Sequence, residues 1–138
     1  MKSHLLKLSF ALTALVALTA QAAEARQYIQ CAYADTFDRT VVNLDGERSA
    51  LFLTDGVHNP DEIRILKKLQ EVQGTATHAV FQTLPLNSAD DVQETVTIAR
   101  EFVGVASRDF DLELTMTQRS TGRSQTFEFN CFSALYEE

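Results

Sequence analysis

Two cysteines, Cys31 and Cys131, stand 100 positions apart, and no other cysteine occurs in the 138-residue chain. In an oxidising compartment such a pair predicts one intramolecular disulfide, with two buried free thiols or a metal-binding pair as the alternatives. A bond that closes a loop of this length stabilises a fold by about 4 to 5 kcal/mol in the chain-entropy model. The first and last structured segments must then lie side by side, so we expect a sheet whose ends meet.

The first 25 residues have the features of a secretory signal peptide. A basic start is followed by an apolar run over 8–18 and by small residues at A-x-A spacing, which predict cleavage after Ala22 or Ala25. A retained membrane anchor is the alternative, but the run has only about half of the ~20 apolar residues that a spanning helix needs. We therefore expect a single exported β-rich domain of residues 26–138, either periplasmic or secreted.

Removal of the signal peptide makes an acidic chain more acidic. The whole sequence has 12 basic and 19 acidic residues, a net charge of −7. Lys2 and Lys7 leave with the signal peptide, and Glu24 leaves with it in the longer cleavage, so the net charge becomes −9 or −8. Such a domain repels nucleic acid and anionic lipid, which makes a basic protein the better candidate partner. Solubility alone is the other explanation of the charge.

Strand-like alternation dominates the chain. From Phe110 to Met116 apolar and polar residues alternate strictly, and 126–135 repeat the pattern after a turn at Gly122. The remaining strand-like segments are 27–34, 77–84 and a hairpin over 39–54 that turns at Asp45 and Gly46. The sequence therefore predicts a mainly β fold, an antiparallel barrel or curved sheet of six to eight strands whose terminal strands are joined by the disulfide.

Two segments do not follow the β pattern clearly. Asn59 can cap a helix that begins at Pro60, and apolar residues then recur every third position, which predicts one short helix over about 60–72. The segment 90–103 has valines at helical spacing after a possible capping box, yet it is rich in β-branched and aromatic residues. We expect one long or bent strand there, with a helix as the alternative.

The stretch DGVHNPDE, residues 55–62, concentrates polar side chains. Asp55, His58 and Asp61 form a candidate polar site, but their spacing matches no metal-binding motif. A turn followed by a helix start explains each residue of the stretch except His58. The structural interpretation is therefore favoured, and neither a metal nor a cofactor is predicted.

Other candidate catalytic residues are few. His78 is the only other histidine of the mature chain, and no nucleophile motif accompanies it. Acids occur in pairs at Asp90 with Asp91 and at Asp109 with Asp111. Glycoside hydrolysis needs two carboxyls facing each other across a cleft, a geometry that the sequence does not reveal.

The two ends of the chain resemble those of the exported C-type lysozyme inhibitors, small barrels with a Y-x-C motif near the mature start and an N-C motif near the end. Here Tyr28 and Cys31 stand one residue further apart, as Y-I-Q-C, and Asn130 precedes Cys131. The likeness covers only the ends, and the S-G-x-x-Y loop of that family has no counterpart. No inhibitory residues are assigned from it.

Three functional classes remain. The leading expectation is an exported, acidic, non-enzymatic domain that binds or inhibits another protein, because no catalytic signature is present. The first alternative is a small exported hydrolase that uses His58 or His78 with nearby acids. The second is a structural or assembly subunit of the envelope, built around the alternating terminal strand from Phe127 to Tyr136.

Overall fold

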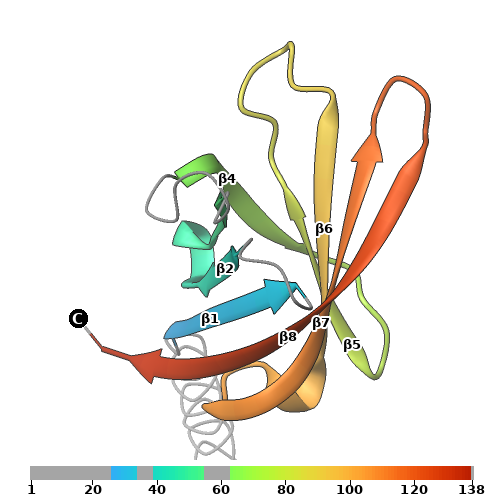
Figure 1. Ribbon diagram of the computed structural model, residues 1–138. Helices are drawn as coiled ribbons and strands as arrows, with labels where there is room; N and C mark the ends of the chain where they lie inside the picture. Colours follow the sequence, from blue (N-terminus) through green and yellow to red (C-terminus); the bar gives the residue numbers. More distant parts are fainter. Residues whose placement is uncertain (1–25, 34–38, 55–62, 138) are drawn as a thin grey trace, which may run out of the picture.

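The computed structural model describes residues 26–33, 39–54 and 63–137. These residues form eight β-strands and two short 3-10 turns (Figure 1). In chain order the elements are β1 (Arg26–Tyr33), β2 (Arg39–Leu44), η1 (Gly46–Arg48), β3 (Ala50–Thr54), β4 (Ile63–Val72), β5 (His78–Thr83), β6 (Val92–Ala99), η2 (Arg100–Phe102), β7 (Ser107–Gln118) and β8 (Ser124–Tyr136).

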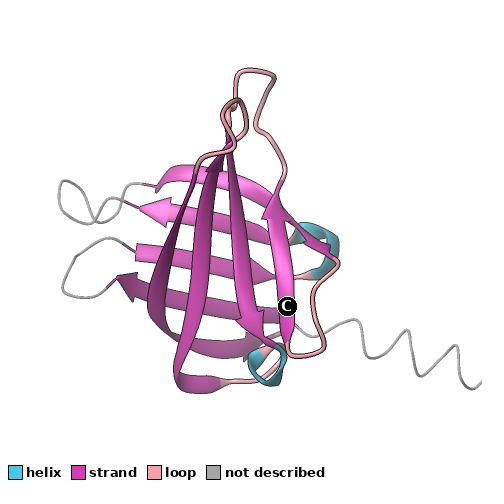
Figure 2. Ribbon diagram, turned by 90° about the vertical axis from the view of Figure 1, so that its right-hand side faces the viewer, coloured by secondary structure: helices cyan, strands magenta, loops and turns pink. Residues whose placement is uncertain are grey.

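The strands follow one another around a closed barrel (Figure 2). Each strand pairs antiparallel with the next in the chain, and β8 returns to pair antiparallel with β1. Closure satisfies the backbone groups that an open sheet would leave unpaired at its edges. The prediction of a mainly β, antiparallel barrel is confirmed.

The predicted disulfide lies at the seam where the barrel closes. Cys31 of β1 stands directly opposite Cys131 of β8 in the strand register, and the two sulfurs are bonded at 2.06 Å. Both side chains are buried in the core. The bond therefore joins the first strand to the last, as expected. A disulfide is typical of proteins that fold in an oxidising compartment, and in this respect it is consistent with export.

Alternation along the strands fills the interior of the barrel. In β7, Phe110, Leu112 and Leu114 are buried, whereas Asp111 and Glu113 between them are exposed. Other strands contribute inward-facing residues in the same way, among them Ile29, Val42, Leu44, Leu51, Leu69, Phe81, Val96, Ile98 and Phe129. These buried side chains form one cluster inside the barrel, so the interior has a packed core.

The helix predicted over about 60–72 is wrong where the structure describes it. Residues 63–72 form strand β4, and 60–62 lie outside the described residues. Two neighbouring side chains explain the error, because Leu66 faces outward and is 50% exposed while Lys67 points into the barrel. An apolar residue on the outside next to a charged residue on the inside hides the two-residue period of a strand. The apolar residues then recur every third position, as in a helix.

The strand expected within 90–103 is confirmed. Residues 92–99 form β6, and the 3-10 turn η2 follows directly and bends the chain. The β-branched residues of this segment pack well on a pleated sheet, and this preference prevails over the helical spacing of its valines.

The loop between β6 and β7 closes one end of the barrel. The buried side chain of Gln27 donates hydrogen bonds from its amide nitrogen to the carbonyls of Phe102 (2.7 Å) and Val105 (3.0 Å). Its amide oxygen accepts a hydrogen bond from the backbone N–H of Gly104 at 2.8 Å. Phe102 stacks on Phe110 with the ring centroids 4.9 Å apart. One buried amide therefore satisfies three backbone groups of the loop and holds it over the core.

Candidate functional site

A network of charged side chains lies inside the barrel, toward the end opposite the Gln27 loop. Lys67 of β4 is 3% exposed, and its Nζ lies 2.9 Å from Oε1 of Glu94 in β6, a fully buried carboxylate. The same Nζ lies 2.9 Å from Oδ2 of Asp90, which stands two residues before the start of β6. The other oxygen of Glu94 accepts a hydrogen bond from the hydroxyl of Thr83 at 2.7 Å. Strands β4, β5 and β6 are thus joined by charge and hydrogen bonds.

Asp90 attaches the loop between β5 and β6 to this network. Its carboxylate accepts hydrogen bonds from the backbone N–H of Leu86 at 3.0 Å and from Lys67. These hydrogen bonds lower the pKa of Asp90 from 3.8 to about 2. The bond from Leu86 has the larger effect and the bond from Lys67 the next. Asp90 is therefore ionised at all but strongly acidic pH.

Asp91 joins the same loop to the turn between β7 and β8. Its carboxylate accepts hydrogen bonds from the hydroxyl (2.6 Å) and the backbone N–H (2.9 Å) of Ser120. The hydroxyl contact is the main cause of the lowered pKa of Asp91. The adjacent acids Asp90 and Asp91 therefore fasten loops together, and they do not face each other across a cleft.

The buried network is satisfied within the fold. Lys67 also donates a hydrogen bond to the carbonyl of Val92 at 2.8 Å. Among the described residues, no buried side-chain nitrogen or oxygen lacks a hydrogen-bond partner. Charged groups whose contacts are all taken up by the protein have no free capacity for a substrate. The remaining candidate sites are on the outer surface of the barrel.

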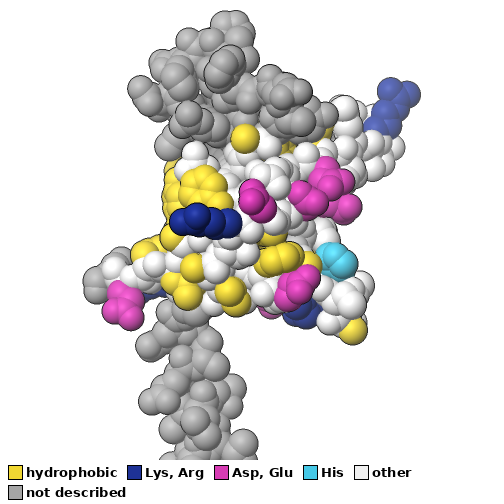
Figure 3. Space-filling view, turned by 60° about the horizontal axis from the view of Figure 1, so that its bottom comes forward, with side chains coloured by type: hydrophobic (Ala, Val, Ile, Leu, Met, Phe, Trp, Pro, Cys, Tyr) yellow, Lys and Arg dark blue, Asp and Glu magenta, His cyan; other side chains and the backbone are white. Residues whose placement is uncertain are grey.

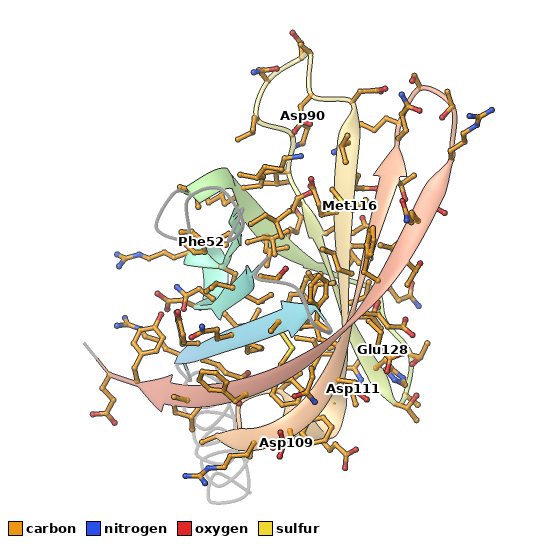
Figure 4. All side chains as sticks on the ribbon, in the orientation of Figure 1. Phe52, Asp90, Asp109, Asp111, Met116 and Glu128 are labelled. Atoms are coloured by element: carbon orange, nitrogen blue, oxygen red, sulfur yellow. A yellow bond between two sulfur atoms is a disulfide. The ribbon has the colours of Figure 1, made fainter. Side chains whose placement is uncertain are left out.

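A groove on the outer surface of β6, β7 and β8, which we call the acidic groove, gathers four carboxylates. It has a volume of about 330 Å³ and is lined by His78, Thr97, Ala99, Phe102, Asp109, Phe110, Asp111, Glu113 and Glu128. Figure 4 shows three of the acids, Asp109, Asp111 and Glu128, along the lower part of the molecule, far from Asp90. In Figure 3, which brings the bottom of the molecule forward, acidic side chains (magenta) lie above and beside a histidine (cyan), and a basic side chain (dark blue) lies next to the nearer one.

The four acids of the acidic groove form no salt bridge within the described part of the chain. Glu113 lies directly opposite Glu128 in the register of β7 and β8, an arrangement in which like charges repel. No lysine or arginine of the described ranges forms a salt bridge with any of the four acids. The four carboxylates therefore make the acidic groove electronegative.

Asp109, which lines this groove, lies in an irregular part of β7. The register of β7 against β8 shifts between Ser107 and Phe110, which marks a β-bulge, and Asp109 has a φ of 55°. Aspartate adopts this left-handed conformation more readily than most residues other than glycine. A bulge redirects the side chains around it. Asp109, Asp111 and Glu113 share the outer face of β7 by strand alternation, and the register of β8 adds Glu128 opposite Glu113.

His78 also lines the acidic groove, but its ring contacts a hydroxyl. It begins β5, is exposed, and has Nδ1 at 2.8 Å from Oγ1 of Thr77. A histidine that acts as a general base is ordinarily oriented by an acceptor such as a carboxylate on its second ring nitrogen. The contacts of His78 within the described residues do not include such a pair.

A second groove, which we call the aromatic groove, crosses the outer surface of β8, β1, β2 and β3. It has a volume of about 460 Å³ and is lined by Tyr28, Asn43, Phe52, Ala134 and Tyr136. The hydroxyl of Tyr136 donates a hydrogen bond to the side-chain oxygen of Asn43 at 2.7 Å. Apart from this polar pair, the lining is apolar. Figure 4 shows Phe52 on the side of the barrel away from Asp111 and Glu128.

Exposed apolar side chains continue the aromatic groove on both sides. Tyr28 of the lining is itself 39% exposed. Beyond the lining, Phe132 of β8 is 49% exposed, and Leu66 of β4, which pairs with Phe52, is 50% exposed. Large contiguous apolar patches on a protein surface often mark interaction sites. Aromatic residues are also enriched in the centres of protein interfaces. This face therefore has the composition of a docking surface.

The sequence-based candidates have different outcomes. Cys31 and Cys131 are bonded as predicted. Asp55, His58 and Asp61 lie outside the described residues, so the candidate polar site stays a hypothesis. Within 26–33, 39–54 and 63–137, no three His, Cys, Asp or Glu side chains are placed to hold a metal ion. No helix within those ranges has the length and apolar character needed to cross a membrane.

Sequence reasoning missed both the aromatic groove and the buried charge network. A signal for the groove is present, since Tyr28, Phe132 and Tyr136 occupy positions that alternate with the buried residues of β1 and β8. Their convergence with Phe52 depends on the strand register, which the sequence does not specify. The buried charges did leave a trace in the sequence. Lys67 and Glu94 lie in the two segments whose periodicity was ambiguous, which became β4 and β6.

Comparisons with known proteins identify no relative: no protein-family model, no curated protein and no solved structure matches the chain. The fold defines its class as an up-and-down antiparallel barrel of eight described strands, closed by one disulfide.

Proposed function

We propose that the chain is an exported, non-enzymatic domain that binds another protein through the aromatic groove. The observation that carries this proposal is the set of outward-facing rings of Tyr28, Phe52 and Tyr136 around a hollow of about 460 Å³. The barrel interior is already filled by other side chains, so these rings are not needed to complete the core. A partner that covers them removes apolar surface from water, which favours association.

The groove also has the means to orient a partner. The side chains of a β-barrel stand on a rigid sheet, so the rings lose little conformational freedom on binding. The hydrogen bond between Tyr136 and Asn43 places a polar pair at an otherwise apolar surface. Apolar surface with a few fixed polar groups is the usual composition of a specific binding site.

The structural-subunit alternative requires a strand that can pair with a neighbouring molecule. Strand β8 pairs with β7 along one edge and with β1 along the other, and Cys131 bonds it to β1. A strand with both edges occupied is poorly suited to complete the sheet of another subunit. These contacts favour the binding function over assembly through β8.

The hydrolase alternative keeps one observation in its favour, because His78 and four carboxylates line the same groove. It predicts that His78→Ala abolishes an activity while the melting temperature stays unchanged. A screen of the mature wild-type protein against ester, peptide and glycoside substrates, repeated with this variant, tests the alternative. An activity that depends on His78 would overturn the proposal of a non-enzymatic domain.

The binding proposal is tested by affinity capture from exported and extracellular fractions. Wild-type residues 26–138 should retain a protein at stoichiometric level, and the double variant Tyr28→Ala/Phe132→Ala should lose it. Leu86→Ala is the matched control, because Leu86 is 59% exposed but lies in the loop between β5 and β6. Equal retention by all three proteins would show that the aromatic groove is not the binding site.

A further inference from the structure

We infer that the aromatic groove binds a proline-rich segment of the partner protein, in the extended left-handed polyproline II conformation. The inference rests on the proposed function, since it assumes that the aromatic groove binds a protein. It adds the conformation and composition of the segment that enters the groove. The closure of the barrel, a free hydrogen-bond donor and the uncharged lining each favour this occupant.

The aromatic groove is built around one small residue. On the outer face of β8, Ala134 stands between Phe132 and Tyr136, and in the strand register it lies directly opposite Tyr28 of β1. A methyl group between larger rings leaves a hollow. Asn43 of β2 lies opposite Tyr28 on its other side. The lining comes from β8, β1, β2 and β3, so the hollow crosses the strands and does not follow any one of them.

Closure of the barrel leaves no place for a peptide to add a strand. Such binding needs an open sheet edge, at which the backbone of the peptide pairs with an unpaired strand. Each of the eight described strands is paired on both sides. A peptide at the aromatic groove must therefore be recognised through its side chains and through single hydrogen bonds.

A free donor distinguishes between the remaining peptide conformations. The side-chain oxygen of Asn43 accepts a hydrogen bond from Tyr136, and within the described residues its amide nitrogen donates to no group. That nitrogen can donate to a backbone carbonyl of the partner. The carbonyls of an α-helix are bonded within the helix, whereas a polyproline II helix has no internal hydrogen bonds and leaves its carbonyls free. Proline also has no N–H that the apolar rings would leave unsatisfied.

Charge and area disfavour other occupants. None of the described lining residues is charged, so the groove offers no cation for a phosphorylated or acidic segment. The net charge of −7 also repels such a segment. A stable homodimer buries about 800 Å² on each copy. An aromatic side chain has about 150 to 250 Å² of surface, so the exposed parts of Tyr28 and Phe132 together supply only roughly 200 Å².

The segment that fits is short. Neighbouring strands lie about 4.8 Å apart, so a groove over four adjacent strands crosses about 14 Å of sheet. A polyproline II helix rises about 3.1 Å per residue, so four or five residues cover the groove. Proline-rich segments are known to dock in aromatic-lined grooves in this conformation, which they hold before binding and therefore at little cost in entropy.

Two mirror-image peptides test the conformation. Octaproline of L-residues, capped at both ends, forms the left-handed helix, and octaproline of D-residues has the same composition, charge and apolar surface with the opposite hand. Binding of each to residues 26–138, which contain all eight described strands, is measured by NMR titration. We expect the L-peptide to bind with a Kd below about 1 mM and the D-peptide to bind at least about ten-fold more weakly.

Two variants change the groove without removing a ring. Ala134→Leu fills the hollow, and Asn43→Asp replaces the amide donor by an acceptor to which Tyr136 can still donate. Each should weaken binding of L-octaproline by about ten-fold or more while the melting temperature stays close to that of the wild type. Ala89→Leu is the matched control, because Ala89 is exposed in the loop between β5 and β6, and it should bind as the wild type does.

The outcomes separate this inference from the proposed function. Equal binding of the two octaprolines, or unchanged binding by both groove variants, overturns the inference. If Tyr28→Ala/Phe132→Ala loses the captured protein but neither octaproline binds, the groove binds protein in another conformation and only the inference is wrong. If that double variant keeps the captured protein and neither octaproline binds, both are wrong. A dimer in light scattering that dissociates in Ala134→Leu would show that a second copy occupies the groove, which also overturns the inference.

Discussion

At the scale of single residues, the unusual feature of this barrel is the ion pair in its core. Glu94 is fully buried and Lys67 is 3% exposed, and their atoms lie 2.9 Å apart. Removal of two charges from water is costly, and the attraction between them offsets that cost only when hydrogen bonds satisfy the remaining groups. Here Thr83 and Asp90 provide those hydrogen bonds. Each member of the network therefore depends on the others.

This dependence predicts strongly non-additive mutations. Lys67→Met leaves Glu94 as an uncompensated buried carboxylate and should lower the free energy of unfolding by about 3 to 5 kcal/mol. Glu94→Leu, which leaves Lys67 with Asp90, should cost slightly less. The double variant removes both charges and should be more stable than Lys67→Met alone. Urea unfolding of the four proteins measures the coupling.

Lys68→Met serves as the control, because Lys68 is the exposed neighbour of Lys67 on the same strand. It should change the free energy of unfolding by less than about 0.5 kcal/mol. Additive effects of Lys67→Met and Glu94→Leu would mean that the pair is not coupled in solution, contrary to the structure.

At the scale of elements, the same ion pair explains which parts of the fold the sequence revealed. Strand β7 and its hairpin with β8 were predictable because polar and apolar residues alternate without exception from Phe110 to Met116. The two ambiguous segments became β4 and β6, the strands that contribute Lys67 and Glu94. A charged residue at an inward position breaks the two-residue period, and the local pattern then cannot identify the strand.

The candidate site was less predictable than the fold for a related reason. The aromatic groove combines side chains of β8, β1, β2 and β3, and the acidic groove needs Glu113 opposite Glu128. Alternation indicates which face of a strand a residue occupies, but not which residue of another strand lies beside it. Register comes from turn geometry and from the closure of the barrel. The outward aromatic residues could be recognised in the sequence, whereas their convergence could not.

The loop between β5 and β6 gives a prediction about acid stability. The contacts of Asp90 lower its pKa from 3.8 to about 2, so its ionised form is favoured by folding. A lowered pKa contributes stability that is complete above the unfolded value near pH 4 and is lost as the pH falls toward 2. Asp90→Asn should therefore be less stable than wild type at pH 6, and this difference should shrink between pH 4 and pH 2.

The measurement is the difference in free energy of unfolding between wild type and Asp90→Asn at pH 6, 4, 3 and 2. The comparison isolates Asp90 because all other acids are common to both proteins. A difference that stays constant from pH 6 to pH 2 would contradict the proposed role of the Asp90 charge in holding the loop.

At the scale of the whole molecule, the two ends of the described chain are held together twice. Strand β8 pairs with β1 over eight residue pairs, from Arg26 opposite Tyr136 to Tyr33 opposite Phe129, and the disulfide covalently joins the same two strands. Strand pairing between distant ends requires closure of a long loop, which is entropically costly in the unfolded chain. The disulfide removes most of that cost, because the ends remain joined when the chain unfolds.

The bond should therefore contribute a large share of the stability of the barrel. We expect Cys31→Ala/Cys131→Ala to lower the free energy of unfolding by about 4 to 5 kcal/mol, against the roughly 5 to 15 kcal/mol of an ordinary small protein. Urea unfolding of the wild type with and without reductant separates the bond from the lost sulfur packing, since the reduced wild type keeps both sulfurs. The reduced protein should be nearly as destabilised as the double variant. If reduction leaves the stability unchanged, pairing of β1 with β8 alone holds the barrel closed, and the cysteines are not what makes the ends of this chain meet.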